Sequence, residues 1–204
     1  MNTRRTAAVA AAFMLAAIAL DTQGGTGSMA TVKLPAPALK SAVSVEEAIQ
    51  RRRSRRQFTS EPLSLAQIGQ VLWSAQGITG AGGRKRAAPS AGATYPMELF
   101  VAVGPGTVQG LEAGVYHYLP EGHNLEKVLD GDIRSRVAAA ALGQEVLAAA
   151  PADILMAAVY ERTARRYGRE RSFRYVAMEA GHIGQNIYLQ CESLGLGTVA
   201  ERTH

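Results

Sequence analysis

The segment Arg52-Arg53-Ser54-Arg55-Arg56 gathers arginines around one hydroxyl, after a short helical pattern and shortly before Phe58. A dianionic phosphate needs fixed cations together with hydroxyl or amide donors, and arginine can offer it two parallel hydrogen bonds where lysine cannot. The segment is therefore a candidate phosphate site. The alternative is a solvated basic helix end, which the helix dipole favours.

A second segment has the composition of a ligand-contacting loop, Pro89-Ser90-Ala91-Gly92-Ala93-Thr94-Tyr95-Pro96-Met97-Glu98-Leu99. Its small residues allow the backbone to approach a planar ligand closely, and Tyr95 offers a ring for stacking. Without further information, it is only a loop that precedes a strand.

Other types of site are poorly represented. Cys191 is the single cysteine, which excludes an intramolecular disulfide and a thiolate metal site, and the four histidines lack metal-ligand spacing. We therefore expect no protein-bound metal, and no nucleophile–base constellation stands out. A lone His182 in a helical pattern is more often a satisfied core histidine than a catalyst. Gly181 and Gly184 are costly in a helix, which indicates close helix packing, for example at a dimer interface.

These separated segments resemble the nitroreductase-like FMN-dependent oxidoreductases, in the SagB-type branch that includes the azoline dehydrogenases of peptide-modifying clusters. Arg52–Arg56 resembles the Arg-Arg-Ser-x-Arg stretch that begins the family's FMN site. Pro89–Glu98 resembles its Pro-Ser-Gly-Gly-Ala-x-Tyr-Pro-x-Glu stretch, with Ala91 in place of the more usual glycine. Gly110–Tyr118 and Glu179–Asn186 are further matches, so the resemblance covers about residues 44–199.

The resemblance implies an FMN site in a homodimer. Arg52, Arg53 and Ser54 would hold the phosphate and the ribityl chain, and Arg56 would approach the pyrimidine edge of the flavin. The loop would contact the FMN of the partner subunit through Pro89, Ser90, Ala91, Gly92 and Tyr95. Gly195 and Gly197 would lie toward the reactive edge of the flavin.

Two departures from the family pattern change what is expected. Arg166-Tyr167 stands where azoline dehydrogenases carry a Lys-Tyr pair implicated in deprotonating the heterocycle. Because an arginine stays protonated, it is a poor general base, so azoline oxidation is not favoured; Tyr167 remains the catalytic candidate, as an acid or by orienting substrate.

The family normally continues after Ala200 with a loop, a helix and a last strand, which Glu201-Arg202-Thr203-His204 does not match. We therefore expect a C-terminally incomplete domain with an unpaired sheet edge, poor FMN binding or marginal folding.

The function implied by the resemblance is FMN-dependent oxidoreduction. Hydride would pass through flavin N5 from NAD(P)H or an organic substrate, and the electrons would reach a small molecule or a peptide. A degenerate, non-catalytic FMN-binding protein is one alternative. A basic nucleic-acid-binding protein is another, because the net charge is +5 and the arginines are clustered. Few aromatic residues lie among those arginines and no nucleic-acid module is visible, so we expect no nucleic-acid partner.

The rest of the chain predicts the elements that position these residues. With 204 residues and 47% hydrophobic composition, the chain can bury one sizeable core. Ser44 and Ser64 begin helices, each with a Glu or Gln three residues later. The other expected elements are strands over residues 99–103, 114–119, 125–129 and 152–159, a helix from Asp132 through Leu142, and a long helix over residues 172–194 that ends at Gly195. They predict one α+β domain, and the resemblance implies a central, mostly antiparallel sheet flanked by helices, one of them long and central.

The N-terminus predicts export. Two arginines, Arg4 and Arg5, precede an apolar run of 14 residues, Ala7–Leu20, which is too short to span a membrane comfortably. Ala17-Ile18-Ala19 places signal-peptidase cleavage before Leu20, by an ordinary or a twin-arginine route, with an uncleaved anchor as the alternative. We therefore divide the chain into a signal peptide (1–20), a linker (21–43) and the FMN-binding domain (44–204). The protein is expected to be periplasmic or extracellular, with no stable membrane span after removal of the signal.

Overall fold

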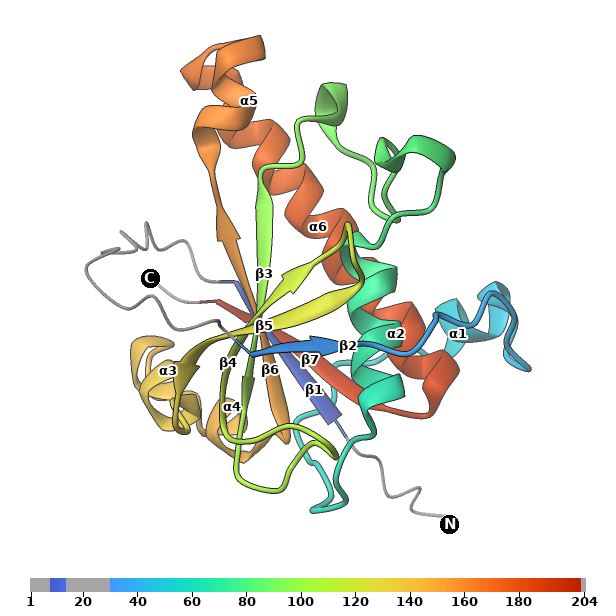
Figure 1. The fold of residues 1–204 in the computed structure, drawn as a ribbon, viewed down its shortest axis with the longest axis vertical. Helices are drawn as coiled ribbons and strands as arrows, with labels where there is room; N and C mark the ends of the chain where they lie inside the picture. Colours follow the sequence, from blue (N-terminus) through green and yellow to red (C-terminus); the bar gives the residue numbers. More distant parts are fainter. Residues whose placement is uncertain (1–7, 14–29, 203–204) are drawn as a thin grey trace.

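A seven-stranded sheet forms the centre of the computed structural model, which describes residues 8–13 and 30–202 (Figure 1). Its strand order is β2-β5-β4-β3-β6-β1-β7. Neighbouring strands are antiparallel from β2 to β6 and parallel from β6 to β7. The strands are β1 (Ala8–Phe13), β2 (Thr31–Lys33), β3 (Met97–Val103), β4 (Gly114–Leu119), β5 (Asn124–Asp130), β6 (Ala152–Ala158) and β7 (Gly197–Arg202). The predicted α+β fold with a mostly antiparallel sheet is confirmed.

Helices cover both faces of this sheet. They are α1 (Val45–Arg51), α2 (Leu65–Gln76), α3 (Arg134–Ala140), α4 (Glu145–Ala149), α5 (Tyr160–Tyr167) and α6 (Arg169–Leu194). Both predicted capping boxes form, because Ser44 Oγ accepts from Glu47 N at 3.1 Å and Ser64 Oγ accepts from Gln67 N at 3.2 Å. Gly195 ends α6 in the left-handed conformation, as predicted. Local capping chemistry therefore fixes the ends of the helices that border the arginine segment.

Successive side chains of the central strands point into two separate cores. Val101 and Ile154 pack with the buried faces of α2 and α6. Ala102 and Leu155 point the other way and pack with α3 and α4. The larger core fixes α6 against the sheet, and α6 carries the residues that contact both predicted site segments.

Three parts of the chain differ from the sequence-based expectation. Asp132 Oδ1 accepts from Arg134 N, the first residue of α3, at 3.0 Å, and its other oxygen pairs with the Arg134 guanidinium at 2.7 Å, but Ile133 stands between Asp132 and the helix. The helix ends at Ala140 rather than Leu142. The segment expected to be a linker contains β2, and Leu34, the residue after that strand, is buried in the larger core with 2% of its surface exposed. Helix α5, which contacts the Pro89–Tyr95 loop, was not predicted.

Strand β1 lies within the segment that the sequence assigns to a signal peptide. It pairs in parallel with β6 on one side, from Val9 to Phe13, and with β7 on the other, from Ala8 to Phe13. The proposed cleavage site at Ala17–Leu20 lies outside the described residues, so export stays a prediction. No helix in the described part of the chain is long and apolar enough to cross a membrane.

We predict that removal of residues 1–19 destabilises the fold, because β6 and β7 each lose a hydrogen-bonded neighbour. At about 0.5–1.5 kcal/mol net per hydrogen bond, the loss amounts to several kcal/mol and lowers the melting temperature by roughly 5–10 °C. Differential scanning calorimetry of the full and shortened chains measures this, with a chain lacking residues 2–6 as the control. Equal melting temperatures for all three chains would show that β1 contributes nothing to stability.

Candidate functional site

The arginine segment leaves α1 as extended chain and runs beside the end of α6. Arg52 is the C-cap residue of α1, with φ −49° and ψ 121°. Three residues later, Arg55 N donates to the carbonyl of Thr198 at 2.9 Å, which ties the segment to β7. Gly195 is the C-cap residue of α6, and Gly197 is the first residue of β7. The structure therefore places the arginine segment beside the junction that carries these two glycines.

Tyr188 on α6 links these pieces. Its hydroxyl shares a hydrogen bond with Ser54 Oγ at 2.9 Å and accepts one from Ala200 N at 3.0 Å. The Arg52 guanidinium lies 5.2 Å from the centre of the Tyr188 ring, within cation–π range. Sequence analysis did not single out this tyrosine. The available signal was a phenol next to the apolar face of the long helical pattern, where a hydroxyl needs a polar partner.

The four arginines have different electrostatic partners. Arg55 binds Glu192 at 3.0 Å, and Arg56 Nε binds Glu201 Oε1 at 3.0 Å. Arg53 donates only to main-chain carbonyls, those of Gln50 and of Arg52. Within residues 8–13 and 30–202, neither Arg52 nor Arg53 forms an ion pair. Two guanidinium groups therefore remain available for an external anion, while the other two are partly neutralised.

The Pro89–Tyr95 loop is held in an unusual backbone conformation. Positive φ values occur at Gly92 (57°), Ala93 (53°) and Tyr95 (42°). A Cβ added to Gly92 would lie 2.5 Å from the Tyr167 hydroxyl and 2.8 Å from Arg166 Nε, so any side chain there would displace the side chains of α5 and would be strained at a positive φ. Strain of this kind persists only where the surroundings hold it.

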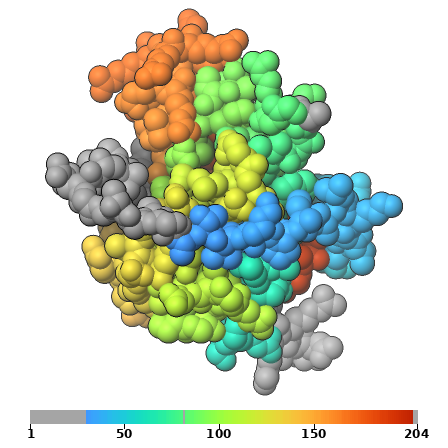
Figure 2. Space-filling view, in the orientation of Figure 1, coloured from blue at the N-terminus to red at the C-terminus, as the bar shows by residue number. Residues whose placement is uncertain are grey.

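Helix α5 provides most of that support. Arg162 donates to the carbonyl of Tyr95 at 2.9 Å, Thr163 shares a hydrogen bond with Thr94 at 2.9 Å, and Arg166 donates to the carbonyl of Gly92 at 3.3 Å. Figure 2 shows α5 (orange) next to the green segment that contains the loop, at the top of the view. The predicted catalytic Tyr167 therefore lies directly against the predicted ligand loop.

An ion-paired carboxylate anchors Arg162 in turn. Glu98 pairs with Arg162 and lies 2.8 Å from His117 Nε2. Burial alone raises the pKa of Glu98, but the His117 hydrogen bond and the Arg162 charge outweigh it and hold the pKa below the usual value. Glu98 is therefore ionised at neutral pH and keeps Arg162 directed at the loop.

His182 lies on the opposite side of the same loop. The side chain is exposed, and its Nδ1 lies 3.3 Å from the carbonyl of Pro89. The interpretation of His182 as a core histidine is thus wrong, because α6 turns this position toward the loop. Gly181 is also exposed, with no side-chain or neighbouring atom within 4 Å of an added Cβ, whereas Gly184 is buried.

The structure does not join the two groups of site residues within one chain. We call Arg52–Arg56 with Gly195 and Gly197 the arginine cluster, and Pro89–Tyr95 with Tyr167 the loop cluster. Throughout the described part of the chain, no hydrogen bond or ion pair connects them. They contact different parts of α6: the loop cluster lies against Tyr175 and His182, and the arginine cluster against Tyr188 and Glu192. In Figure 1 the loop lies toward the α5 side of that helix, away from α1.

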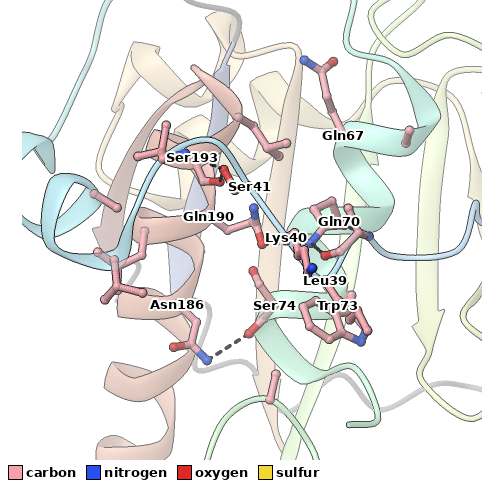
Figure 3. A pocket seen from close by; sticks show the side chains of 18 of the residues that line it. Leu39, Lys40, Ser41, Gln67, Gln70, Trp73, Ser74, Asn186, Gln190 and Ser193 are labelled. Atoms are coloured by element: carbon pink, nitrogen blue, oxygen red, sulfur yellow. Dashed lines mark hydrogen bonds between the residues drawn. The ribbon is translucent and has the colours of Figure 1, made fainter.

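A separate cavity of about 680 Å³ opens between α2, α6 and the segment before α1 (Figure 3). Polar pairs cross its walls, with Asn186 Nδ2 donating to the carbonyl of Ser74 at 2.9 Å and Gln70 donating to Gln190 at 3.0 Å. None of the sequence-predicted site residues lines it. The cavity is therefore distinct from both clusters.

Comparison with known proteins identifies the family. The profile of the Nitroreductase family matches residues 49–200, about three quarters of the chain. The chain belongs to the nitroreductase family. It is 48% identical to the nitroreductase-family protein MJ1384 of Methanocaldococcus jannaschii over 158 residues, 78% of each protein.

More distant members of the nitroreductase family include proteins that process peptides by name. The microcin B17-processing protein McbC of Escherichia coli is 31% identical over 137 residues, which are 66% of this chain and half of McbC. The trifolitoxin-processing protein TfxB of Rhizobium leguminosarum is 34% identical over 120 residues, 55% of this chain and 31% of TfxB. These matches confirm the predicted branch.

Solved structures agree with this assignment. A nitroreductase of Ralstonia eutropha superposes with a TM-score of 0.70 at 31% identity, over 82% of this chain and 73% of that one. The E. coli microcin synthetase McbBCD complex, solved with truncated pro-MccB17 bound, superposes with a TM-score of 0.58 at 26% identity, over 80% and 64% of the chains. The predicted nitroreductase fold is thus confirmed.

We predict that Tyr188→Phe loosens the arginine cluster, because it removes the partner of Ser54 and leaves Ala200 N without an acceptor. Two lost hydrogen bonds should lower the free energy of unfolding by about 1–3 kcal/mol, measured by urea denaturation. Tyr175→Phe is the matched control, since the Tyr175 ring packs against Tyr167 and its hydroxyl has no hydrogen bond among the described contacts. Equal effects of the two substitutions would refute the linking role of Tyr188.

Proposed function

We propose that this nitroreductase-family protein is an FMN-dependent oxidoreductase that takes electrons from NAD(P)H or an organic donor and passes them to a second substrate. The observation that carries the proposal is the pair of unpaired guanidiniums, Arg52 and Arg53, beside the Ser54 hydroxyl and the glycines of the α6–β7 junction. When bound, FMN supplies hydride acceptance and donation at its N5 atom.

The chemistry of the donor set fits FMN. A terminal phosphate carries close to two negative charges, and two free guanidiniums can balance them with bidentate hydrogen bonds. Arg56, whose charge Glu201 partly neutralises at 3.0 Å, suits a neutral pyrimidine edge better than a phosphate. The Arg52, Arg53, Ser54 and Arg56 roles expected from the resemblance are therefore chemically consistent with their surroundings.

A homodimer would complete this site. Because the arginine and loop clusters contact different parts of α6 and share no hydrogen bond or ion pair among the described residues, the loop cluster of one subunit is proposed to meet the arginine cluster of the other. Exposed apolar side chains support an interface of this kind: Val45 is 63% exposed, Ile49 55% and Met178 58%. Val45 and Ile49 lie one turn apart on α1, so they form an adjacent apolar pair facing solvent, and Met178 lies on α6.

Each cluster then has a defined task. Arg52 and Arg53 bind the phosphate, and the small residues Ser90, Ala91 and Gly92 allow close approach of the loop to the cofactor. Tyr167 lies against Gly92, where its hydroxyl can donate a proton or orient a substrate. Arg166 stays protonated and donates to the Gly92 carbonyl, so it supports the loop and does not act as a base.

The substrate is proposed to be a small molecule or a peptide. McbC and TfxB, named for processing microcin B17 and trifolitoxin, support the peptide. The chain spans half or less of those two proteins, so their partners and products are not carried over. The Arg166 substitution argues against azoline oxidation as the reaction.

Export is also proposed, on the charged start, short apolar core and small-x-small site at Ala17–Ala19. N-terminal sequencing of protein from separated cell fractions tests it. A protein beginning at Leu20 outside the cytoplasm supports export, whereas an intact Met1 in the cytosolic fraction contradicts it.

We predict that Arg53→Ala weakens FMN binding about 10- to 150-fold, which corresponds to loss of one charge-assisted bond of about 1.5–3 kcal/mol. Flavin fluorescence titration measures the dissociation constant. Arg165→Ala is the control, because Arg165 is an exposed arginine of α5 outside both clusters. Equal affinity of the Arg53 variant and the parent would refute the phosphate assignment.

Activity separates the enzyme from a non-catalytic flavoprotein. Anaerobic addition of NADH or NADPH to the flavin-loaded protein should bleach the flavin absorbance, and readmitting an electron acceptor should restore it. A loaded protein that no donor reduces would instead support the degenerate, non-catalytic alternative.

A further inference from the structure

A buried carboxyl group lies behind the loop cluster. Glu179 of α6 is 2% exposed, although glutamate is seldom buried without partners. Gln76 at the end of α2 donates to Glu179 Oε1 at 2.9 Å, and the Ser90 hydroxyl lies within hydrogen-bonding reach of the same carboxyl. Arg86 and His182 are the charged or titratable groups that face it. Glu179 thus connects α2 and α6 to the loop.

Ser90 transmits this connection into the loop. Its oxygen accepts from Tyr95 N at 2.9 Å, which leaves its single proton free to point at Glu179. The resulting chain runs from Tyr95 N–H through Ser90 to the Glu179 carboxyl. Its starting residue, Tyr95, has a φ of 42°, a strained conformation for tyrosine that needs external support.

We propose that Glu179 is a positioning residue for the Pro89–Tyr95 loop, acting through the Ser90 hydroxyl to hold Tyr95 and the small residues between them in the shape that contacts ligand. The proposal rests on the proposed function for the identity of that ligand. The Gln76–Glu179 and Tyr95–Ser90 hydrogen bonds and the approach of Ser90 to Glu179 all lie within one subunit and require no flavin.

The charge of the Glu179 carboxylate allows the positioning role to be distinguished from simple structural support. Burial raises the pKa of Glu179, and the Ser90 and Gln76 hydrogen bonds and the Arg86 and His182 charges oppose that shift. A raised carboxyl pKa means that the folded state binds the proton more tightly than the unfolded state, so stability falls as pH rises from the usual carboxyl value through the raised one. Glu179→Gln keeps the shape and removes this cost. A purely structural role therefore predicts that Glu179→Gln changes nothing or raises the melting temperature.

The positioning role predicts a different result for the loop. Hydrogen–deuterium exchange of the peptide that contains the Tyr95 amide reports the Ser90 contact directly, without flavin. Ser90→Ala and Glu179→Gln should each accelerate that exchange roughly 5- to 10-fold, the loss expected for one hydrogen bond. Because both act on one chain of bonds, the double variant should exchange no faster than the faster single variant. Glu170→Gln, an exposed glutamate on the same helix, should leave exchange unchanged.

The same variants separate failure of this inference from failure of the proposed function. If the parent protein binds no FMN but the exchange pattern appears, only the proposed function fails. If the parent binds FMN and Glu179→Gln exchanges like the parent, or if the two substitutions act additively, the positioning role is overturned. A Glu179→Gln variant that melts at or above the parent temperature and exchanges the Tyr95 amide at the parent rate would assign Glu179 to structural support alone.

Discussion

The packing of α6 against the sheet is the constraint on which the remaining structure depends. Val176, Ile183, Ile187 and Cys191 recur at helical spacing and are buried in the larger core, which fixes both the position and the rotation of the helix. Once that rotation is set, Glu179 and His182 face the loop cluster, and Tyr188 and Glu192 face the arginine cluster. One apolar stripe therefore orients the polar contacts of both halves of the candidate site.

The geometry of a single helix also explains why the site is divided. His182, which lies against Pro89, and Tyr188, which contacts Ser54, are six residues apart, which corresponds to about 9 Å along a helix that rises 1.5 Å per residue. The two clusters therefore lie at successive positions along α6, and the proposal is that a second copy brings its loop cluster to the arginine cluster. The exposed Gly181 offers room for such a copy to approach closely, since nothing in the described chain lies within 4 Å of an added Cβ.

Elements specified by local chemistry were predictable, and elements specified by distant contacts were not. Ser44 and Ser64 begin helices because their capping partners lie three residues away, and β4 has the predicted bounds because glycine and proline bracket its apolar run. Helix α5 was missed because its sequence has little apolar periodicity and the contacts that support it, from Thr94 and Glu98, are over sixty residues distant. Tyr188 and Glu179 were missed as site residues for the same reason: their roles come from Ser54 and Ser90, which only folding brings near.

A flavin site shared between two subunits is the proposal that connects both clusters, and complementation between two defective subunits is its most direct test. Arg53→Ala damages the arginine cluster, and Gly92→Val damages the loop cluster, because its side chain would collide with Tyr167. Flavin content should be measured for each variant alone and after the two are unfolded and refolded together. A shared site predicts little flavin in either variant alone and recovery of one intact site in each mixed dimer. Flavin content in the mixture no higher than in the separate variants would contradict a shared site.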